Sequence, residues 1–413
     1  MTKIPAEFRL KEIDPAKLDI PLDGPRDEPI TINLGPSHPA MHGTIRMVAD
    51  FIGEQISNIE VECGFLHRGF EKMAECRNHV QFIPYTDRLN YVSPLINNFG
   101  YVGALEDMFG IEITDRCAWL RTMFSEIARI SDHLTCLAAI ALETGAMTAF
   151  LYYMQCREDL WEHINHATGA RQTVSYARIG GLARDIPPGW IERCAEILEK
   201  MIPVLGDIHG LLDNNRLFLD RNMGICECSQ EDAMNFGFTG PFLRSTGVAY
   251  DIRNVNPYLK YAEVEWEVPV GKHGDNYDRY YVRMREIDES LKICFQCFNK
   301  IPEGPLMAED YRAHLPNKTE VYGSIEGLIN HFKLVIDGPQ VPKGQIYHAV
   351  EAANGELGFY IVSDGSGTAY RLHVRPPCLL ILGSLDRLLI GHQLADIIPT
   401  FGSVNMVGGE CDR

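Results

Sequence analysis

Histidines, tyrosines and charged side chains gather in three short motifs of the N-terminal quarter of the chain. The first is the loop Gly35-Pro-Ser-His-Pro-Ala-Met-His-Gly43. Its His38 and His42 flank Pro39, so they cannot share one face of a regular helix as a metal-binding pair would. A glycine-bounded loop that carries histidine is a usual place for ligand contacts. Solvent-exposed loop histidines are the alternative interpretation.

The other two motifs place charges and tyrosines in apolar surroundings. In Gly64-Phe-Leu-His-Arg-Gly-Phe-Glu-Lys72, four ionisable side chains lie within six residues. Helix capping or ion pairing is the structural alternative to a functional role there. Pro84-Tyr-Thr-Asp-Arg-Leu-Asn-Tyr91 holds two tyrosines six residues apart around an Asp-Arg pair. The alternative for this motif is a core tyrosine whose hydroxyl is hydrogen-bonded.

The end of the chain is a fourth candidate. Gly402-Ser-Val-Asn-Met-Val-Gly-Gly-Glu-Cys-Asp-Arg413 is rich in glycine and apolar residues, unlike the frayed polar end of a typical domain. We expect this tail to be buried, which would make Arg413 and its carboxylate an interior feature.

Twelve cysteines are scattered along the chain, and two pairs are closely spaced. Cys226-Glu-Cys228 is too tight for the usual metal knuckle, and Cys294-Phe-Gln-Cys297 has no second pair nearby. Cys294 also lies within an apolar stripe at helical spacing. We therefore expect small core residues in a reducing compartment and no metal bound by this chain.

Composition and charge exclude several classes of protein. The 413 residues include 38 Lys+Arg and 56 Asp+Glu, for a formal net charge of −18. This balance excludes a non-specific nucleic-acid binder, and no polybasic stretch suggests an anionic membrane surface as partner. The apolar runs fall far short of the ~20 residues of a membrane helix. The sequence shows no nucleotide-binding glycine loop and no signal-peptide core, so we expect an acidic, soluble, intracellular protein.

The hydrophobic pattern predicts an α+β fold with a bundle of long helices at its centre. Residues 1–28, rich in proline and aspartate, predict an irregular arm. Residues 29–72 predict a β-rich domain that carries the histidine loop, with a turn at Gly53-Glu54. The helical core is expected over residues 73–335. Its long helices are predicted at 120–141, 147–167, 188–214 with a kink or break at Pro203, and 278–299.

Strands are predicted in the second half of the chain as well. Glu263-Val-Glu-Trp-Glu-Val268 alternates strictly and predicts a strand inserted into the helical core. Residues 336–413 predict a β-hairpin region followed by the buried tail. There the Asn354-Gly355 pair, between the runs 345–350 and 358–362, is the strongest hairpin signal in the chain. Residues 369–375 predict a third strand.

The first long helix is strongly amphipathic. One continuous face is apolar, and the opposite face with its edge is polar. The polar side chains are Arg121, Ser125, Glu126, Arg129, Asp132, His133 and Cys136.

Together, these segments resemble the quinone-site subunit of respiratory complex I. This is the 49-kDa-type, or D-type, subunit of NADH:quinone oxidoreductase, which is related in fold to the large subunit of nickel–iron hydrogenases. The resemblance covers essentially the whole chain and rests on the three motifs, on Gly145-Ala-Met-Thr-Ala-Phe150 and on Glu410-Cys-Asp-Arg413. It implies a hydrogenase large-subunit-like bundle and a pocket where two electrons and two protons reduce quinone to quinol, coupled to proton translocation.

The resemblance also implies roles for individual residues. His42 and Tyr91 would hold the quinone headgroup and donate protons to its two carbonyl oxygens. Glu143 would pair with the histidine, and Val407 would line the pocket with apolar atoms. Arg68 would lie beside the terminal [4Fe–4S] cluster of a neighbouring small iron–sulfur subunit, where its charge would favour the reduced cluster.

Cofactors and partners follow from the same resemblance. The chain itself would bind no cofactor: quinone is the substrate, the [4Fe–4S] cluster belongs to the neighbour, and NADH and FMN act elsewhere in the complex. The expected partners are the small iron–sulfur subunit, the hydrophilic connecting (30-kDa-type, C-type) subunit and a membrane subunit that forms the quinone entry channel, with no nucleic acid. We expect a peripheral position on the cytoplasmic side of a bacterial inner membrane, since no transit peptide is seen.

The sequence departs from the family's commoner residues at four positions. Glu143 replaces an aspartate and is one methylene longer, so we expect its contact with the histidine to be indirect. Thr173 replaces a histidine near the cluster, which removes a source of pH dependence in the cluster potential. Asn405 replaces an aspartate and Gly408 a bulky phenylalanine, so we expect a looser and less charged pocket wall.

Three alternatives accompany this interpretation. A working nickel–iron hydrogenase needs two pairs of cysteine ligands. It is rejected because the segment 84–91 holds no cysteine and the tail offers only Cys411. A non-catalytic scaffold of the same fold is opposed by the presence of His42 and Tyr91. A ferredoxin- or deazaflavin-driven relative of the complex stays open, because this chain carries no nucleotide site.

Overall fold

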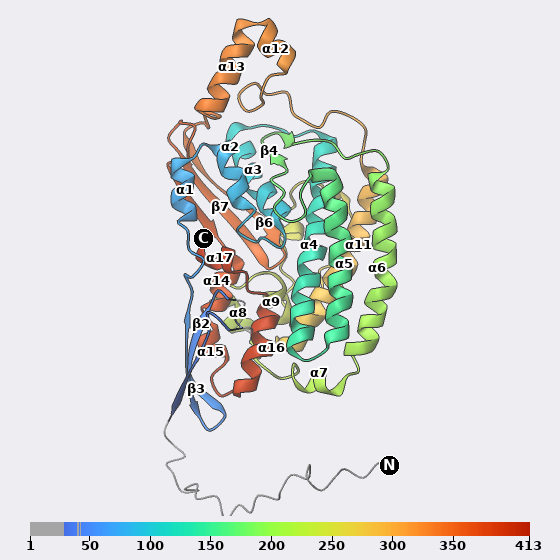
Figure 1. Ribbon diagram of the computed structural model, residues 1–413, viewed down its shortest axis with the longest axis vertical. Coiled ribbons are helices and arrows are strands. Elements are labelled where there is room, and N and C mark those ends of the chain that lie inside the picture. Colours follow the sequence, from blue (N-terminus) through green and yellow to red (C-terminus); the bar gives the residue numbers. More distant parts are fainter. Residues whose placement is uncertain (1–28, 39–40, 42) are drawn as a thin grey trace, which may run out of the picture.

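A bundle of long helices forms the body of the protein (Figure 1). The computed structural model describes residues 29–38, 41 and 43–413. The predicted arm over 1–28 and His42 lie outside the described residues. The four predicted long helices are confirmed as α4 (Asp115–Glu143), α5 (Met147–Thr168), α6 (Trp190–Leu212) and α11 (Asn276–Lys300). The α+β class is confirmed as well, because small sheets accompany the helices.

Helix α6 continues through Pro203 without a break. The prediction allowed either a kink or a break at this residue, and the break is wrong. Pro203 lies on the exposed side of the helix, where water can replace the backbone hydrogen bond that proline cannot donate. On the other side, Met201 and Leu205 are buried in the bundle and keep the helix in place across the proline.

Helix α4 is the central helix of the body. Every side chain from Cys117 to Leu134 is buried, including the polar face. Thr114 caps the helix by accepting a hydrogen bond from the Cys117 backbone N–H. An amphipathic pattern is typical of a helix with one solvated face. Here the polar face contacts buried ions of other elements instead.

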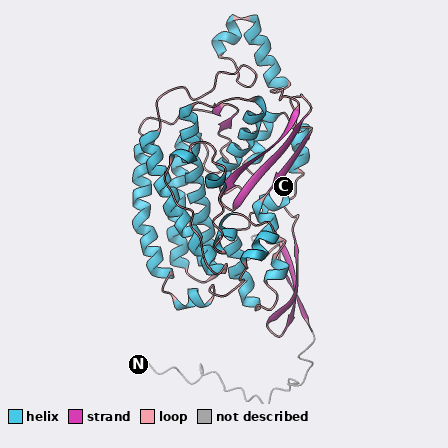
Figure 2. Cartoon of the chain, turned by 180° about the vertical axis from the view of Figure 1, so that it is seen from behind, coloured by secondary structure: helices cyan, strands magenta, loops and turns pink. Residues whose placement is uncertain are grey.

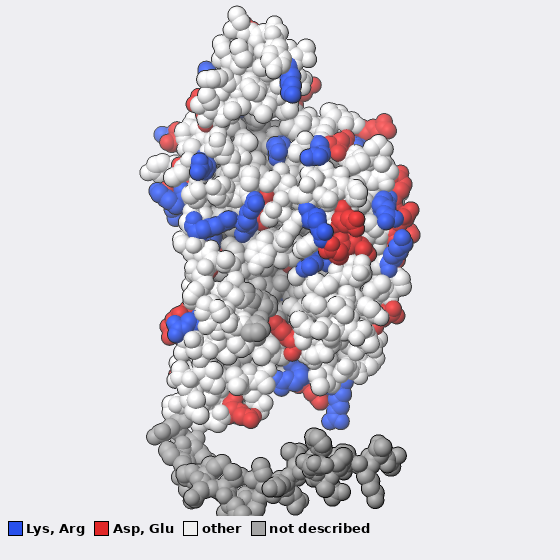
Figure 3. Space-filling view, viewed as in Figure 1, with Lys and Arg blue, Asp and Glu red and all other residues white. Residues whose placement is uncertain are grey.

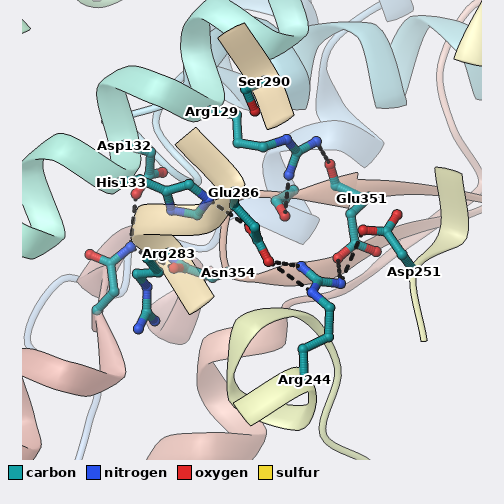
Figure 4. A network of polar contacts seen from close by, with 12 residues as sticks. Arg129, Asp132, His133, Arg244, Asp251, Arg283, Glu286, Ser290, Glu351 and Asn354 are labelled. Carbon is teal, nitrogen blue, oxygen red and sulfur yellow. Dashed lines mark hydrogen bonds and ion pairs between the residues drawn. The ribbon is translucent and has the colours of Figure 1, made fainter. Parts of the chain in front are cut away.

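A network of buried ion pairs, the core ion network, joins α4 and α11 to the strand β6 (Gly344–Ala352) and the short helices α9 (Gly240–Ser245) and α10 (Ile252–Val255). Figure 4 shows Arg244 between Glu286 on one side and the carboxylates of Asp251 and Glu351 on the other. The members of the network are Glu126, Arg129, Arg244, Asp251, Arg253, Glu286 and Glu351. All seven side chains are at most 2% exposed.

Two antiparallel three-stranded sheets flank the bundle. The N-terminal sheet has the order β1 (Ile30–Leu34), β2 (Arg46–Ile52), β3 (Gln55–Glu62). The C-terminal sheet has the order β6, β7 (Gly355–Ser363), β8 (Arg371–Arg375), and it lies along one side of the helices when seen from behind (Figure 2). The predicted hairpin is confirmed, because Ala352 pairs with Gly355 across a tight turn.

The predicted strand over residues 263–268 is wrong. A 3₁₀ helix (Tyr261–Glu263) is followed by extended backbone that pairs with side chains of α11. The Glu265 backbone N–H donates to Gln296 Oε1 at 2.9 Å, and the Glu267 N–H donates to Glu289 Oε2 at 3.1 Å. The alternation of exposed and buried residues is therefore real, but its hydrogen-bond partners are a helix's side chains and not a neighbouring strand.

The remaining elements are shorter than the four long helices. They are α1 (Phe70–Cys76), α2 (His79–Thr86), α3 (Pro94–Phe109), β4 (Ala177–Arg178), β5 (Gly181–Leu182), α7 (Arg216–Asp220), α8 (Gln230–Asn235), α12 (Lys318–Gly323), α13 (Ile325–Ile336), α14 (Pro377–Leu382), α15 (Leu385–Leu388), α16 (Leu394–Val404) and α17 (Gly408–Asp412). Helices α12 and α13 project from one end of the body (Figure 1).

The surface carries both signs of charge. On the face shown in Figure 3, acidic and basic side chains are interspersed and most of the surface is uncharged. No large single-sign field covers this face. Among the described residues, no helix combines the length and the apolar character that a membrane crossing requires.

Candidate functional site

Segments that are far apart in the sequence meet around the C-terminal tail. We call this region the tail junction; it comprises the described residues of the loop 35–45, residues 86–93, Asp132 of α4 and the tail 404–413. Thr44 Oγ1 donates to Met406 Sδ at 3.7 Å, which joins the loop to the tail. Asp132 accepts a hydrogen bond from Asn405 of the tail, and Met41 of the loop is fully buried.

Asp132 lies at the centre of the tail junction and is fully buried. Its carboxylate accepts hydrogen bonds from Asn90 Nδ2 at 2.8 Å, Ser93 Oγ at 2.7 Å and Asn405 Nδ2 at 2.8 Å. Three donors stabilise a negative charge that is removed from water. An amide at position 405 can donate to Asp132, whereas an ionised aspartate there would repel it. The replacement of the family's aspartate by Asn405 thus removes a charge from the pocket wall and adds a hydrogen bond to Asp132.

Asn405 also sets the direction of the tail. It ends α16 in the left-handed conformation, with φ of 53°, which asparagine tolerates better than most residues. Its amide reaches Asn354 Oδ1 at 2.5 Å, at the tip of the β6–β7 hairpin. The C-terminal hairpin therefore helps to hold the tail against α4.

Tyr91 lies beside this buried cluster and is itself half-buried. Burial raises the pKa of its hydroxyl, and the nearby Cys378, Cys411, Asp132 and Glu410 raise it further. The hydroxyl therefore stays protonated at neutral pH and is available as a donor. Gln172 Nε2 donates to the Tyr91 backbone carbonyl at 3.2 Å and fixes the main chain at this position.

The prediction that the tail is buried is confirmed. Residues 401–408 and 410–412 are buried, and Arg413 is half-buried. The motif 64–72 lies over the tail: the Leu66 N–H donates to Asp412 Oδ2 at 2.6 Å, and Arg413 Nε donates to Glu71 Oε1 at 3.1 Å. Glu71 of this motif thus forms an ion pair with Arg413, and ion pairing was the alternative to a functional role that the sequence left open.

Arg68 lies at the exposed edge of the tail junction. Its guanidinium donates to the Tyr85 carbonyl at 3.3 Å and stands 5.8 Å from the centre of the Tyr85 ring. Partial burial and the neighbouring Arg88 lower the pKa of Arg68. Beside it, Phe65 and Leu66 are 50% and 43% exposed. A positive charge next to exposed apolar side chains is a surface suited to an interacting protein.

Glu143 and Val407 occupy separate positions. Glu143 is the last residue of α4, eleven residues beyond Asp132, which corresponds to about 16 Å along the helix. Its carboxylate packs directly over Gly402 of α16, where a side chain would collide with it. Val407 is 2% exposed and precedes α17 within the tail junction. The structure therefore brings Tyr91, Asp132 and the tail together and places Glu143 about three turns away.

An apolar cavity of about 450 Å³ adjoins the described loop residues. Its walls include Ile32, Leu34, His38, Met41, Phe51 and Ile398. Cavities of this size with mostly apolar walls are typical of sites for small apolar molecules. His38 supplies a ring that can donate or accept a hydrogen bond at its edge.

The closely spaced cysteines belong to the core, as predicted. Cys294 and Cys297 of α11 are fully buried, and burial raises the pKa of Cys297 to about 12. Burial raises the pKa of Cys228 to about 11. These thiols stay protonated and are poor ligands. Within the described part of the chain, no group of three or more His, Cys, Asp or Glu side chains is arranged to hold a metal ion.

Sequence reasoning missed Asp132, Asn354 and Cys378 as members of this region. Asp132 had a weak signal, as an acid in the middle of the polar face of α4. No pattern linked Asn354 or Cys378 to this region, because the contacts of Asn354 reach residues 24 and 51 positions further along the chain.

Comparison with known proteins places these observations in a family. The family model described as "Respiratory-chain NADH dehydrogenase, 49 Kd subunit" matches residues 143–413. The D-type subunit of an NADH-quinone oxidoreductase of Pelobacter propionicus is 56% identical over 384 residues, 93% of this chain and 95% of that protein. A D-type subunit of the same enzyme in Sorangium cellulosum is 48% identical over 404 residues, 98% and 99% of the two chains. A protein of Bdellovibrio bacteriovorus that is named for the C-type and D-type subunits together is 44% identical over 393 residues, 95% of this chain and 70% of that protein.

Proposed function

The chain belongs to the family of 49-kDa, or D-type, subunits of respiratory NADH:quinone oxidoreductase, and from this premise we propose that its tail junction forms the quinone-reduction site of the complex. As a member of this family, it is part of a proton-pumping, membrane-bound oxidoreductase. The observation that carries the proposal is the meeting of the histidine loop, Tyr91 and the buried tail in one region.

The chemistry of quinone reduction fits these residues. Each carbonyl oxygen of the quinone accepts one proton while two electrons enter the ring. The Tyr91 hydroxyl, kept protonated by its surroundings, donates to one oxygen, and His42 donates to the other. Donors aimed at the two oxygens also stabilise the negative charge that develops there. Val407 contributes an apolar wall, and Glu143 acts on the histidine indirectly from the end of α4.

The electrons come from a [4Fe–4S] cluster of the small iron–sulfur subunit, which docks at the exposed edge with Arg68. That edge presents one guanidinium beside two exposed apolar side chains, and the positive charge favours the reduced cluster. NADH and FMN act in other subunits of the complex. The relatives named above all specify NADH as the donor, which supports NADH over ferredoxin or deazaflavin.

Two further partners are proposed. The C-type subunit is one, since a relative carries the C-type and D-type subunits in a single chain of which the present chain matches 70%. A membrane subunit that forms the quinone entry channel is the other, because quinones are lipid-soluble and the described helices here do not cross a membrane. We place the chain on the cytoplasmic side of the membrane, at the surface of these partners.

Replacing His42 by alanine tests the proposed site. We expect H42A to assemble into the complex and to lower the NADH:quinone reductase rate strongly, because one of the two proton donors is lost. The matched control is H331A on α13, a helix that projects away from the tail junction. Both rates are measured on purified complex. A wild-type rate in H42A would overturn the site.

A further inference from the structure

Glu410 is a buried acid of the tail junction that the proposed mechanism does not use. It lies on α17 with its side chain 0% exposed. Neither of its carboxylate oxygens accepts a hydrogen bond of ordinary geometry from the described residues, although the Cys378 thiol and the Asn90 amide face it. An ionised carboxylate in such a place is unstable, so the site favours the protonated acid.

The groups packed around Glu410 act in both directions, because Asp132 favours the protonated acid whereas the donors of Cys378 and Asn90 favour the carboxylate. Asp132 faces it from α4 and is held as an anion by three donors. Cys378 faces it from α14, Cys411 lies beside it on α17, and Tyr91 lies beyond. Burial is the largest influence and outweighs the donors of Cys378 and Asn90; together with the negative charge of Asp132 it raises the pKa of Glu410 to about 7.

The segments that carry Tyr91 and Glu410 are packed against each other, because a side chain at Gly409 would collide with the backbone carbonyls of Arg88 and Leu89. The charge of Glu410 is one of the causes that raise the pKa of the Tyr91 hydroxyl above its usual value near 10. A phenolate at Tyr91 is thus a stronger base than the carboxylate of Glu410 by about a thousandfold or more, from the ordinary tyrosine pKa of about 10 and an acid near 7. Proton transfer from Glu410 to such a phenolate is therefore downhill.

We propose that Glu410 stores the proton that restores Tyr91 after each quinone reduction. Tyr91 gives its hydroxyl proton to a quinone oxygen and becomes a phenolate. The O–H bond of the Glu410 acid then breaks, the Tyr91 O–H bond forms again, and the negative charge moves to Glu410. There it lies beside the anionic Asp132, and repulsion between the two carboxylates draws in a new proton from water. The inference rests on the proposed function, since it requires Tyr91 to be the donor.

The test compares E410Q, E410D and the wild type in the purified complex. Glutamine keeps the shape of the side chain but holds no transferable acid proton. We expect E410Q to complete the first quinone reduction at the wild-type rate and to slow steady-state turnover at least tenfold, because Tyr91 is not restored. E410D should recover part of the turnover. The matched control is E199Q, at an exposed position on α6, which should behave as wild type.

Two pH measurements separate a proton store from a merely structural residue. In the wild type, turnover should fall as pH rises through about 7, as Glu410 loses its proton, and E410Q should lack this step. The infrared carbonyl band of a protonated carboxylic acid should titrate over the same pH range in the wild type and be missing from the E410Q spectrum.

The outcomes distinguish this inference from the proposed function. If E410Q shows the wild-type turnover and pH profile while Y91F is inactive, Glu410 is no proton store and the quinone site stands. If E410Q assembles but loses the first turnover as well, Glu410 acts on structure and the inference is wrong. If Y91F turns over at the wild-type rate, the quinone site itself is refuted.

Discussion

The Y91F variant should assemble normally and reduce quinone at least 100-fold more slowly than the wild type. Phenylalanine keeps the ring and removes only the hydroxyl, which is the proposed proton donor. General acid catalysis by a positioned side chain contributes about 10²–10⁴-fold to a rate, so its loss should be large. The surroundings of Tyr91 favour a protonated hydroxyl, and no packing is lost on substitution.

The measurement compares two rates on the same preparation of complex. Electron transfer from NADH to quinone should fall, whereas electron transfer from NADH to a water-soluble artificial acceptor that bypasses the quinone site should not change. Y322F is the matched control, since Tyr322 of α12 is 86% exposed and far along the chain from the tail junction. A wild-type rate of quinone reduction in Y91F would contradict the proposed role of Tyr91 and would favour the alternative of a non-catalytic scaffold.

The second large effect is expected in the core ion network, where the pKa values of two glutamates are shifted in opposite directions. Three guanidinium groups, Arg129, Arg244 and Arg253, face four carboxylates. Burial and the charge of Asp251 raise the pKa of Glu351, although Arg244 lies 2.8 Å from its carboxylate and acts in the opposite direction.

Glu286 is the opposite case. It accepts a hydrogen bond from Arg244 Nε at 2.8 Å and contacts His133 Nε2 at 2.8 Å. Despite burial, these two partners hold the pKa of Glu286 well below its usual value. E286Q removes a negative charge that Arg244 needs and should destabilise the protein by about 3–5 kcal/mol, the usual effect of breaking a buried ion pair. The surroundings of Glu351 favour its ionised form less than those of Glu286 do, so E351Q should destabilise the protein less than E286Q does.

Each variant serves as the control for the other, because both are Glu to Gln changes in one network. The amount of assembled complex and its rate of thermal inactivation report the difference. E286Q should assemble poorly and inactivate faster than the wild type, whereas E351Q should lie closer to the wild type in both measurements. Equal destabilisation by the two variants would contradict the inference that the network depends more on the charge of Glu286 than on that of Glu351.

Much of the fold followed from periodicity. The four long helices were predictable because each carries an apolar stripe at helical spacing, and Asn354-Gly355 marked the β6–β7 hairpin. The position of α4 was not predictable, since a polar face does not show whether water or buried ions will cover it. The partners of Glu126 and His133 on this face come from residues more than 100 positions further along the chain. The strand predicted at 263–268 failed for a related reason, because alternation does not reveal which partner completes the hydrogen bonds.

The tail junction was predictable in its parts and not in its assembly. The loop, Tyr91 and the tail each contain residue types suited to proton transfer, and their motifs carried the family resemblance. The contact of Asn405 with Asp132 joins positions 273 residues apart, which no local pattern can reveal. The environment of Glu410 also depends on how distant segments fold together. Its raised pKa could therefore be recognised only in the three-dimensional structure.

The most direct test of the central claim is the position of the quinone headgroup in the assembled complex. A quinone analogue with a photoreactive group on its ring can be attached by light and located by mass spectrometry of peptides. The label should appear in peptides from residues 35–45, from the segment around Tyr91 or from the tail 404–413, and an excess of unlabelled quinone should suppress it. Suppressible labelling of this chain only elsewhere, or of other subunits alone, would contradict a quinone-reduction site at the tail junction.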